Sequence, residues 1–254
     1  MDRRELIHFV AGTVAASSLV NTAATTSSKT PTEAGVKLND GDVILFQGDS
    51  ITDARRDKKK LADRPNDPRG LGDGYPLRIA GQLIRNHPTK QLKCFNRGIS
   101  GHKVPDLQKR WKKDCLDMKP AVLSILVGVN DIWHKMNGKY QGTVKDYRTG
   151  FTKLLKETKR GLPGVQIVVC EPFALRCGAV KDSWYPEFDQ RRQVAVEVAN
   201  AAGAIWVPFQ TMFDTAIAAG SDPQVWAADG VHPTIAGHAS VSYTHLTLPT
   251  TPYV

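Results

Sequence analysis

Short apolar runs recur along the middle of the chain, and stretches with apolar residues at helical spacing separate them. The first run, Val43 to Phe46, stops at Gln47 and Gly48. Runs this short and this apolar are typical of strands that are buried on both faces of a parallel sheet. The predicted strands lie at residues 43–46, 92–95, 122–127, 165–170 and 205–207.

The stretches between these runs predict amphipathic helices. The clearest covers about residues 143–160, with its lysines toward water, and ends at residues 161–164, Gly-Leu-Pro-Gly. The predicted inward faces are Val144, Tyr147, Phe151, Leu154 and Leu155; Leu77, Ala80, Gly81 and Ile84; Val104, Leu107, Trp111 and Cys115; Val194, Ala195, Val198 and Ala202; and Met212, Phe213, Ala216 and Ile217. This alternation of strand and helix predicts an α/β fold whose parallel sheet is covered on both faces.

Two long connections are candidates for shaping a binding cleft. Residues 55–74 are rich in Gly, Pro and charge and are longer than most connections of this kind; the alternative is a disordered surface insertion. Residues 172–186 carry Phe173, Trp184 and Tyr185, and we expect them to form the main wall of the cleft.

Polar residues follow the predicted strands at their carboxyl ends, which form the edge of the sheet where α/β proteins usually have their active sites. Gly48-Asp49-Ser50 follows the first strand, Gly98-Ile99-Ser100-Gly101 the second, and Asn130-Asp131 the third. A late loop carries Asp229-Gly230-Val231-His232. A serine after a glycine is usually a turn residue or a helix cap, so Ser50 alone is weak evidence for a nucleophile. The evidence comes from its combination with the other polar segments.

A serine hydroxyl needs a base within hydrogen-bond reach to act as a nucleophile. Of seven histidines, His232 is the predicted base; the others are His8, His87, His102, His134, His238 and His245. Asp229 stands three residues before it, so its carboxylate can accept a hydrogen bond from the imidazole ring. An Asx turn with Gly230 is the structural alternative, and the two roles are compatible.

In their order, these four blocks resemble the SGNH (GDSL-type) hydrolases from about residue 42 to residue 239. Within that family the chain is most similar to bacterial acetylxylan esterases, through residues 46–53 (FQGDSITD), 70–75 (GLGDGY), 98–101 (GISG) with 106–107 and 110–111, 130–133 (NDIW) and 232–238 (HPTIAGH). The resemblance implies a three-layer αβα sandwich with a five-stranded, flavodoxin-like sheet in the order 2-1-3-4-5.

The resemblance also implies roles for the site residues. Ser50, His232 and Asp229 would form the catalytic triad, and the oxyanion hole would consist of the main-chain N–H groups of Ser50 and Gly101 and the side-chain amide of Asn130. Gly98, the competing glycine, is assigned to turn geometry. From their positions beside these blocks, Asp49, Asp53 and Asp131 are expected to hold turn backbones. Serine and histidine complete the reaction, so we expect no metal ion and no organic cofactor.

The formal charge of +9 changes this interpretation little. Basic clusters at residues 55–60 and 109–113 are compatible with an acidic polysaccharide or simply with a solvated surface. Trp111, the aromatic residue within these clusters, is assigned to the core, and no known nucleic-acid-binding module is found, so no nucleic-acid partner is expected. The four cysteines are too few for a disulfide-built scaffold. Cys94 and Cys170 are predicted to be buried thiols, and a link between Cys170 and Cys177 stays open.

The two ends of the chain differ from its middle. Residues 1–24 have an Arg3-Arg4 pair and then an uncharged stretch, which predicts a twin-arginine export signal; a short anchoring helix is the alternative. Residues 25–40 are predicted to be a flexible leader and residues 41–240 the hydrolase domain. Residues 241–254 have threonines and prolines where the family has a last helix, and residues 241–246 resemble a translated transposase sequencing adapter. We therefore expect a non-native tail and no final helix beside the histidine loop.

Together these observations predict an exported enzyme, periplasmic or secreted, that meets the membrane only during export. Its predicted reaction is the removal of O-acetyl groups from an acetylated polysaccharide or oligosaccharide, with xylan the first choice. The alternatives are an SGNH lipase, lysophospholipase or thioesterase acting on longer acyl chains, and an inactive carbohydrate-binding protein. The sequence leaves the oligomeric state open and is compatible with a homo-oligomer.

Overall fold

The computed structural model describes residues 36–247, without the side chain of Thr247. The described residues belong to one unit, residues 33–254, and a second unit, residues 1–32, lies outside the description. The predicted export signal (1–24), most of the predicted leader (25–40) and the last part of the predicted tail (248–254) also lie outside the described residues.

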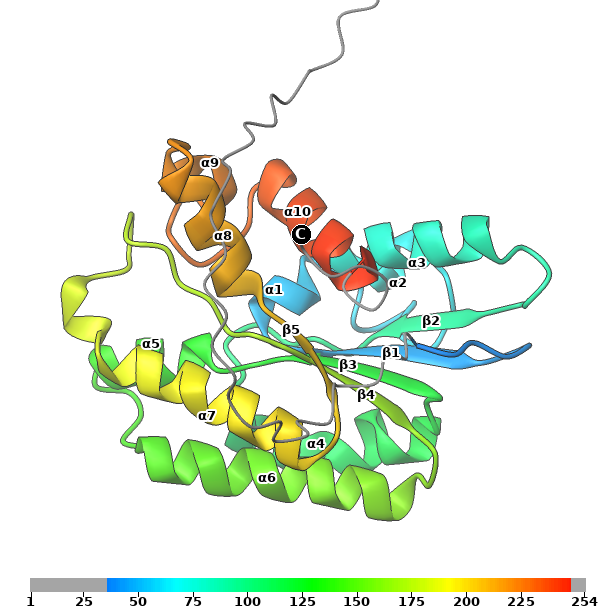
Figure 1. Ribbon diagram of the computed structural model, residues 1–254. Helices are drawn as coiled ribbons and strands as arrows, with labels where there is room; N and C mark the ends of the chain where they lie inside the picture. The colour runs from blue at the N-terminus through cyan, green and yellow to red at the C-terminus, as the bar shows by residue number, and fades with distance from the viewer. Residues whose placement is uncertain (1–35, 248–254) are drawn as a thin grey trace, which may run out of the picture. The chain divides into compact units, whose positions relative to one another are not determined.

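A parallel sheet forms the middle layer (Figure 1). Its strands are β1 Val43–Gly48, β2 Lys93–Asn96, β3 Val122–Leu126, β4 Gln166–Cys170 and β5 Ile205–Val207. Their order is β2-β1-β3-β4-β5, as predicted. In the register, Phe46 of β1 lies beside Asn96 of β2 and Ser124 of β3, so the strands that precede the candidate blocks end at the same edge.

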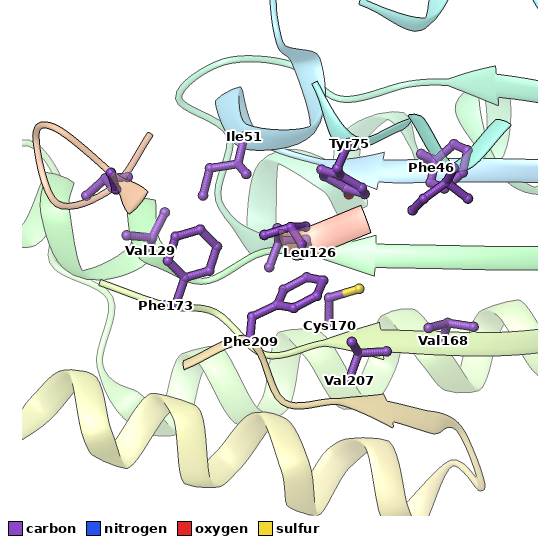
Figure 2. Close-up of a cluster of buried hydrophobic side chains, with 14 of the residues drawn as sticks. Phe46, Ile51, Tyr75, Leu126, Val129, Val168, Cys170, Phe173, Val207 and Phe209 are labelled. Atoms are coloured by element: carbon purple, nitrogen blue, oxygen red, sulfur yellow. The ribbon is translucent and has the colours of Figure 1, made fainter. Parts of the chain in front are cut away.

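Helices cover both faces of the sheet, because successive strand residues point to opposite sides (Figure 1). On one face Phe46, Leu126 and Cys170 join a core with residues from α1, α3, α8 and α10 (Figure 2). On the other, Leu45, Ile125 and Val169 pack with residues from α4, α6 and α7. The described helices are α1 Ser50–Asp53, α2 Pro68–Leu71, α3 Tyr75–Asn86, α4 Val104–Asp114, η1 Leu116–Met118, α5 Val129–Met136, α6 Val144–Gly161, η2 Asp182–Trp184, α7 Glu187–Ala201, α8 Phe209–Ala218, α9 Pro223–Trp226 and α10 Ile235–Thr247. Within residues 36–247, no helix combines the length and the apolar character that crossing a bilayer requires.

The helix patterns were predicted well except in α3. In α6 the predicted face is buried, and Thr143 and Asp146 form a capping box at its start. Trp111 of α4 is buried as a core residue, and its Nε1 donates to Thr158 Oγ1 of α6 at 2.9 Å. In α3, however, the buried residues are Tyr75, Pro76, Ile79 and Ala80, and Gly81 is exposed. The inward face is thus rotated toward Tyr75 and Ile79, whose side chains are fully buried in the core.

The prediction that no final helix lies beside the histidine loop was wrong, whereas the non-native origin of residues 241–254 stays a prediction. Instead of an unstructured tail after residue 240, α10 continues to Thr247 and packs against α3. Val241 is fully buried, and His245 Nε2 lies 2.8 Å from Ser124 Oγ of β3. The apolar sheet face on this side must be covered, and burial there overrides the weak helix propensity of this segment.

The cysteines behave as small apolar residues. Cys94 and Cys170 are buried in β2 and β4, as predicted, and burial raises the pKa of each thiol to about 12. Cys170 and Cys177 are both free, so the disulfide left open by the sequence is not formed in this structure.

The burial of His245 predicts a loss of stability in acid. Burial lowers the pKa of His245 to about 4, from a usual value of 6.5. Between pH 6.5 and about pH 4, His245 is therefore protonated in the unfolded chain but neutral in the folded chain. Because the unfolded chain binds more protons there, the free energy of unfolding falls as the pH is lowered across that interval. In urea unfolding from pH 7.5 to pH 4.5, His245→Gln is expected to lose less stability than the wild type. If the free energy of unfolding fell equally with pH in both proteins, this assignment would be contradicted. His238 is present in both proteins, so its contribution does not affect the difference between them.

Candidate active site

Ser50 is the first residue of α1, directly after β1. The turn between them is tight: a Cβ on Gly48 would lie 2.3 Å from both the Leu126 carbonyl oxygen and Thr52 Oγ1, so only glycine fits. Asp49 caps α1, because its Oδ1 accepts a hydrogen bond from the Ile51 N–H at 3.0 Å. The backbone before and after Ser50 is therefore fixed independently of any substrate.

The structure brings Ser50, His232 and Asp229 into one hydrogen-bonded chain. Ser50 Oγ lies 2.8 Å from His232 Nε2, although 182 positions separate the two residues. On the other side of the ring, His232 Nδ1 lies 2.6 Å from Asp229 Oδ2. With Nδ1–H donating to the carboxylate, Nε2 is left to accept the serine proton. The serine, base and carboxylate expected from the sequence thus lie in the order that such chemistry requires.

Asp229 also holds its own turn. Its Oδ1 accepts from the N–H groups of Val231 at 2.9 Å and His232 at 2.7 Å, so the Asx turn and the imidazole contact occur together. Partial burial opposes ionisation of Asp229, but the hydrogen bonds from the His232 side chain, His232 N–H and Val231 N–H outweigh it and hold the pKa below its usual value. The carboxylate is therefore charged and able to stabilise a positive imidazole.

The loop at residues 172–186 supports the Asp229 turn from behind. Leu175 N–H donates to Gly230 O at 2.7 Å, and Ala179 N–H donates to Asp229 O at 2.9 Å. Gly230 has φ +84°, and a Cβ there would lie 2.5 Å from the Leu175 carbonyl oxygen. Phe173 and Trp184 are buried in the core. This loop therefore supports the histidine turn; its residues do not line the pocket that contains Ser50 and His232, and its part in a substrate cleft stays a prediction.

The two further oxyanion candidates lie at the same edge. Gly101 has φ +79°, and a Cβ there would have only the His134 ring within 4 Å. Asn130, in the first turn of α5, is buried, and its Nδ2 lies 3.4 Å from His102 O; its side chain is among the groups that lower the pKa of Asp49 against the effect of burial. Asp53 Oδ2 accepts from Ser100 N–H at 3.0 Å, which ties the 98–101 loop to α1.

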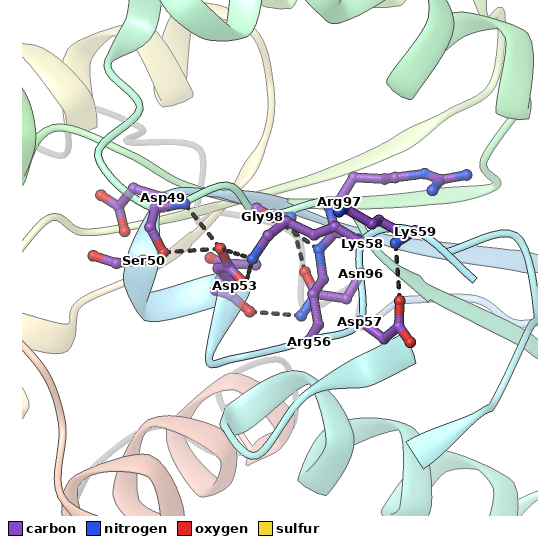
Figure 3. A network of polar contacts seen from close by, with 12 residues as sticks. Asp49, Ser50, Asp53, Arg56, Asp57, Lys58, Lys59, Asn96, Arg97 and Gly98 are labelled. Carbon is purple, nitrogen blue, oxygen red and sulfur yellow. Dashed lines mark hydrogen bonds and ion pairs between the residues drawn. The ribbon is translucent and has the colours of Figure 1, made fainter. Parts of the chain in front are cut away.

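Gly98 has a different role from the one predicted. It does not adopt a left-handed φ, but a Cβ there would lie 2.4 Å from Asp53 N and 2.7 Å from the Thr52 carbonyl carbon. Gly98 is needed for close backbone packing against α1, and the left-handed turn falls at Gly101 instead. Arg56 Nε donates to Gly98 O at 2.8 Å and closes the network around this contact (Figure 3).

The three expected structural aspartates differ in charge. Burial raises the pKa of Asp49 and of Asp131 to about 7. Asp53 is also desolvated, but hydrogen bonds from Lys58 and Ser100 outweigh burial and lower its pKa (Figure 3). Asp49 and Asp53 hold turn backbones, as expected, and Asp131 Oδ2 lies 3.4 Å from Val104 N.

A pocket of about 360 Å³ opens beside the serine and the histidine. Its lining residues are Ser50, Ile51, Ala54, Arg55, Asp73, Ser100, His232, Pro233 and His238. The predicted contribution of residues 55–74 to a cleft is thereby confirmed, and the segment is ordered, with Arg56 buried. Within residues 36–247, no three His, Cys, Asp or Glu side chains are grouped to hold a metal ion.

Sequence reasoning missed the aromatic neighbour of the histidine. Trp133 of α5 lies with its ring centroid 5.8 Å from that of His232 and 5.7 Å from that of Trp184. Its position one turn after Asn130 was the available signal, because residues three apart share a helix face.

Comparison with known proteins identifies the family. The profile of the GDSL-like lipase/acylhydrolase family matches residues 46–240. The chain belongs to this family. An acetylxylan esterase of Geobacillus stearothermophilus is 31% identical over 207 residues, which cover 80% of this chain and 91% of that protein.

Solved structures agree with this family membership. A crystal structure described as that of a GDSL-like lipase from Parabacteroides merdae has a TM-score of 0.81 and 44% identity, covering 85% of this chain and all of that one. The G. stearothermophilus acetylxylan esterase Axe2 has a TM-score of 0.74 and 29% identity over 86% of this chain and 98% of that one. Axe2 was also solved as catalytic mutants in which a serine or a histidine is replaced by alanine. This member of the GDSL family is a carboxylic ester hydrolase with the predicted α/β fold.

The packing of Gly98 against α1 predicts opposite effects for two glycine substitutions. Gly98→Ala forces a Cβ into the α1 backbone and is expected to lower the free energy of unfolding by about 1–3 kcal/mol, with a loss of ester turnover. Gly81→Ala is the matched control. It lies exposed in α3 with nothing within 4 Å of its Cβ, and should raise stability by about 0.5–1 kcal/mol. Urea unfolding and turnover of an aryl acetate measure both effects; equal stabilities for the two variants would refute the packing argument.

Proposed function

We propose that this hydrolase removes O-acetyl groups from a carbohydrate through an acyl-enzyme on Ser50. The observation that carries the proposal is the continuous chain from Ser50 Oγ to His232 Nε2 at 2.8 Å and from His232 Nδ1 to Asp229 Oδ2 at 2.6 Å. A serine, an imidazole and an ionised carboxylate in this order are the groups needed for acyl transfer. The catalytic serine and histidine of the similar enzyme Axe2 give further support.

In the first half of the reaction, Ser50 Oγ attacks the ester carbonyl carbon while His232 Nε2 takes the hydroxyl proton. Asp229 keeps Nδ1–H pointing toward itself and stabilises the imidazolium. Negative charge develops on the carbonyl oxygen, and we assign the N–H groups of Ser50 and Gly101 and the Asn130 amide to receive it. The intermediate then expels the alcohol, which takes its proton from His232, and the acetyl group stays on Ser50.

In the second half, water takes the place of the alcohol. His232 Nε2 accepts a proton from the water as its oxygen attacks the acetyl carbonyl, and the same oxyanion donors stabilise the second intermediate. Collapse releases acetate and returns the proton to Ser50 Oγ. In each half-reaction His232 accepts one proton and donates one, so its ring is neutral again at the end.

The acetyl and carbohydrate assignments have separate supports. Most residues that line the pocket are polar or charged, and only Ile51, Ala54 and Pro233 offer apolar side chains. Polar and charged side chains can hydrogen-bond to a ligand rich in hydroxyl groups, so this lining supports the carbohydrate assignment. The similar acetylxylan esterase favours an acetylated glycan. The polymeric nature of such substrates and the Arg3-Arg4 stretch support action outside the cytoplasm.

Substitutions in the site are expected to differ in severity. Ser50→Ala removes the nucleophile and should reduce acetate release from acetylated xylan to the level without enzyme. Asn130→Ala removes one oxyanion donor and should lower kcat by about 10²–10³ while leaving measurable turnover. Acetate release under initial-rate conditions measures both, and a near-native rate for either variant would refute its assigned role.

Chain-length preference separates the acetylesterase from a long-chain lipase or thioesterase. Aryl acetate is expected to have a higher kcat/KM than aryl octanoate; the reverse order would refute the acetyl assignment. A serine-directed fluorophosphonate separates an esterase from an inactive carbohydrate-binding protein. Folded wild type should be labelled at Ser50 and the Ser50→Ala variant should not; failure to label the wild type would refute the nucleophile.

A further inference from the structure

Two successive residues beside the nucleophile adopt a backbone conformation that side chains disfavour. Ala54 has φ 40° and Arg55 has φ 62°, and neither is glycine. In this left-handed region the Cβ crowds the following carbonyl oxygen, so strained pairs persist only where the surroundings enforce them. Such strain concentrates at functional sites, and here it falls directly after α1.

The surroundings that enforce this turn are backbone contacts. Ala54 N–H donates to Ser50 O at 3.0 Å, and Asp73 N–H donates to Ala54 O at 2.8 Å. A Cβ on Gly72 would lie 2.6 Å from the carbonyl oxygens of both Asp53 and Ala54. The segment that carries Asp73 therefore packs directly on the turn that carries Arg55, and both are held relative to Ser50.

This arrangement brings Arg55 and Asp73 together in the wall of the pocket that contains Ser50 and His232. Arg55 Nε and Nη2 each lie 3.0 Å from Asp73 Oδ2. The two side chains are 85% and 66% exposed, and an ion pair so exposed contributes little to stability. The pair therefore does not account for the strained turn, whereas its position beside the serine suggests a ligand.

The pair retains hydrogen-bonding groups that have no partner in the described part of the chain. Arg55 Nη1 carries free N–H donors and Asp73 Oδ1 is a free acceptor. A third group, His238, lies in the same pocket, and its Nδ1 accepts from Tyr75 N–H at 3.2 Å. Burial lowers the pKa of His238 to about 4, so the neutral ring has its proton on Nε2 as a donor. Donors and an acceptor side by side match adjacent hydroxyl groups, each of which both donates and accepts.

The direction of the reaction decides which half of the ester this pocket receives. The leaving alcohol must take its proton from His232, so the alcohol lies on the histidine side of Ser50. His232, Pro233 and His238 all line the pocket. We propose that Arg55 and Asp73 bind the alcohol half of the ester and select a sugar with a free hydroxyl next to the acetylated oxygen. This assignment rests on the proposed acetyl-carbohydrate esterase activity.

The test compares two acetate esters of different alcohols. Acetylated xylooligosaccharide offers hydroxyls adjacent to the ester, and phenyl acetate offers none. Arg55→Gln and Asp73→Asn should each lower the ratio of kcat/KM for the sugar ester to kcat/KM for phenyl acetate by about tenfold or more. The double variant should lose little beyond either single one, because the two side chains act as a unit. Arg55→Lys keeps the charge without the planar fork and should recover part of the ratio.

Arg148→Gln is the matched control. Arg148 is an exposed arginine paired with Glu197, and it lies on α6, on the opposite face of the sheet from α1. Its ratio should equal that of the wild type. If the Arg55 and Asp73 variants also keep the wild-type ratio while the wild type deacetylates the oligosaccharide, only the assignment of this pair is overturned. If the wild type hydrolyses phenyl acetate but releases no acetate from the oligosaccharide, the carbohydrate function fails, and the assignment fails with it.

Discussion

Close approach of backbones around α1 is the constraint on which the rest of the site depends. Gly48 faces the Leu126 carbonyl oxygen and Gly98 faces Asp53 N, each at a distance that excludes a Cβ. β1, β3 and the loop after β2 thus hold the short helix α1 between them, and Ser50 has little freedom. Because interiors pack at high density, this positioning does not depend on the substrate. His232 then needs only one well-placed loop to reach the serine.

The charge of each carboxylate follows from the balance between burial and hydrogen bonds. Asp49 and Asp131 are buried with few donors, and their pKa values rise to about 7. Asp229 and Asp53 are met by several donors, which outweigh desolvation and lower their pKa values. The carboxylate that contacts His232 is thereby kept charged, while burial reduces the negative charge that Asp49 and Asp131 carry near neutral pH.

Local patterns predicted most of the fold and the members of the site. The apolar runs located all five strands, and the spacing in α4 and α6 located their buried faces, because burial on both sides of the sheet leaves a direct pattern. The distances among Ser50, His232 and Asp229 required the structure, but the spacing of Asp229 and His232 was sufficient to predict a shared turn. Local patterns did not predict how residues 172–186 and 241–247 pack. The conformation of these two segments depends on the distant surfaces that they cover. The sequence also did not separate the close packing of Gly98 from the left-handed φ of Gly101, because both situations require glycine.

The packing of α10 on β3 and α3 also bears on how the protein is made. His245 and Val241 pack against apolar residues that are synthesised far earlier, among them Phe46 of β1 and Tyr75 of α3. In a nascent chain still on the ribosome, the part of this face that α10 covers therefore stays open to water until nearly all of the described residues have emerged. During that time the uncovered face is a site for chaperone binding or aggregation.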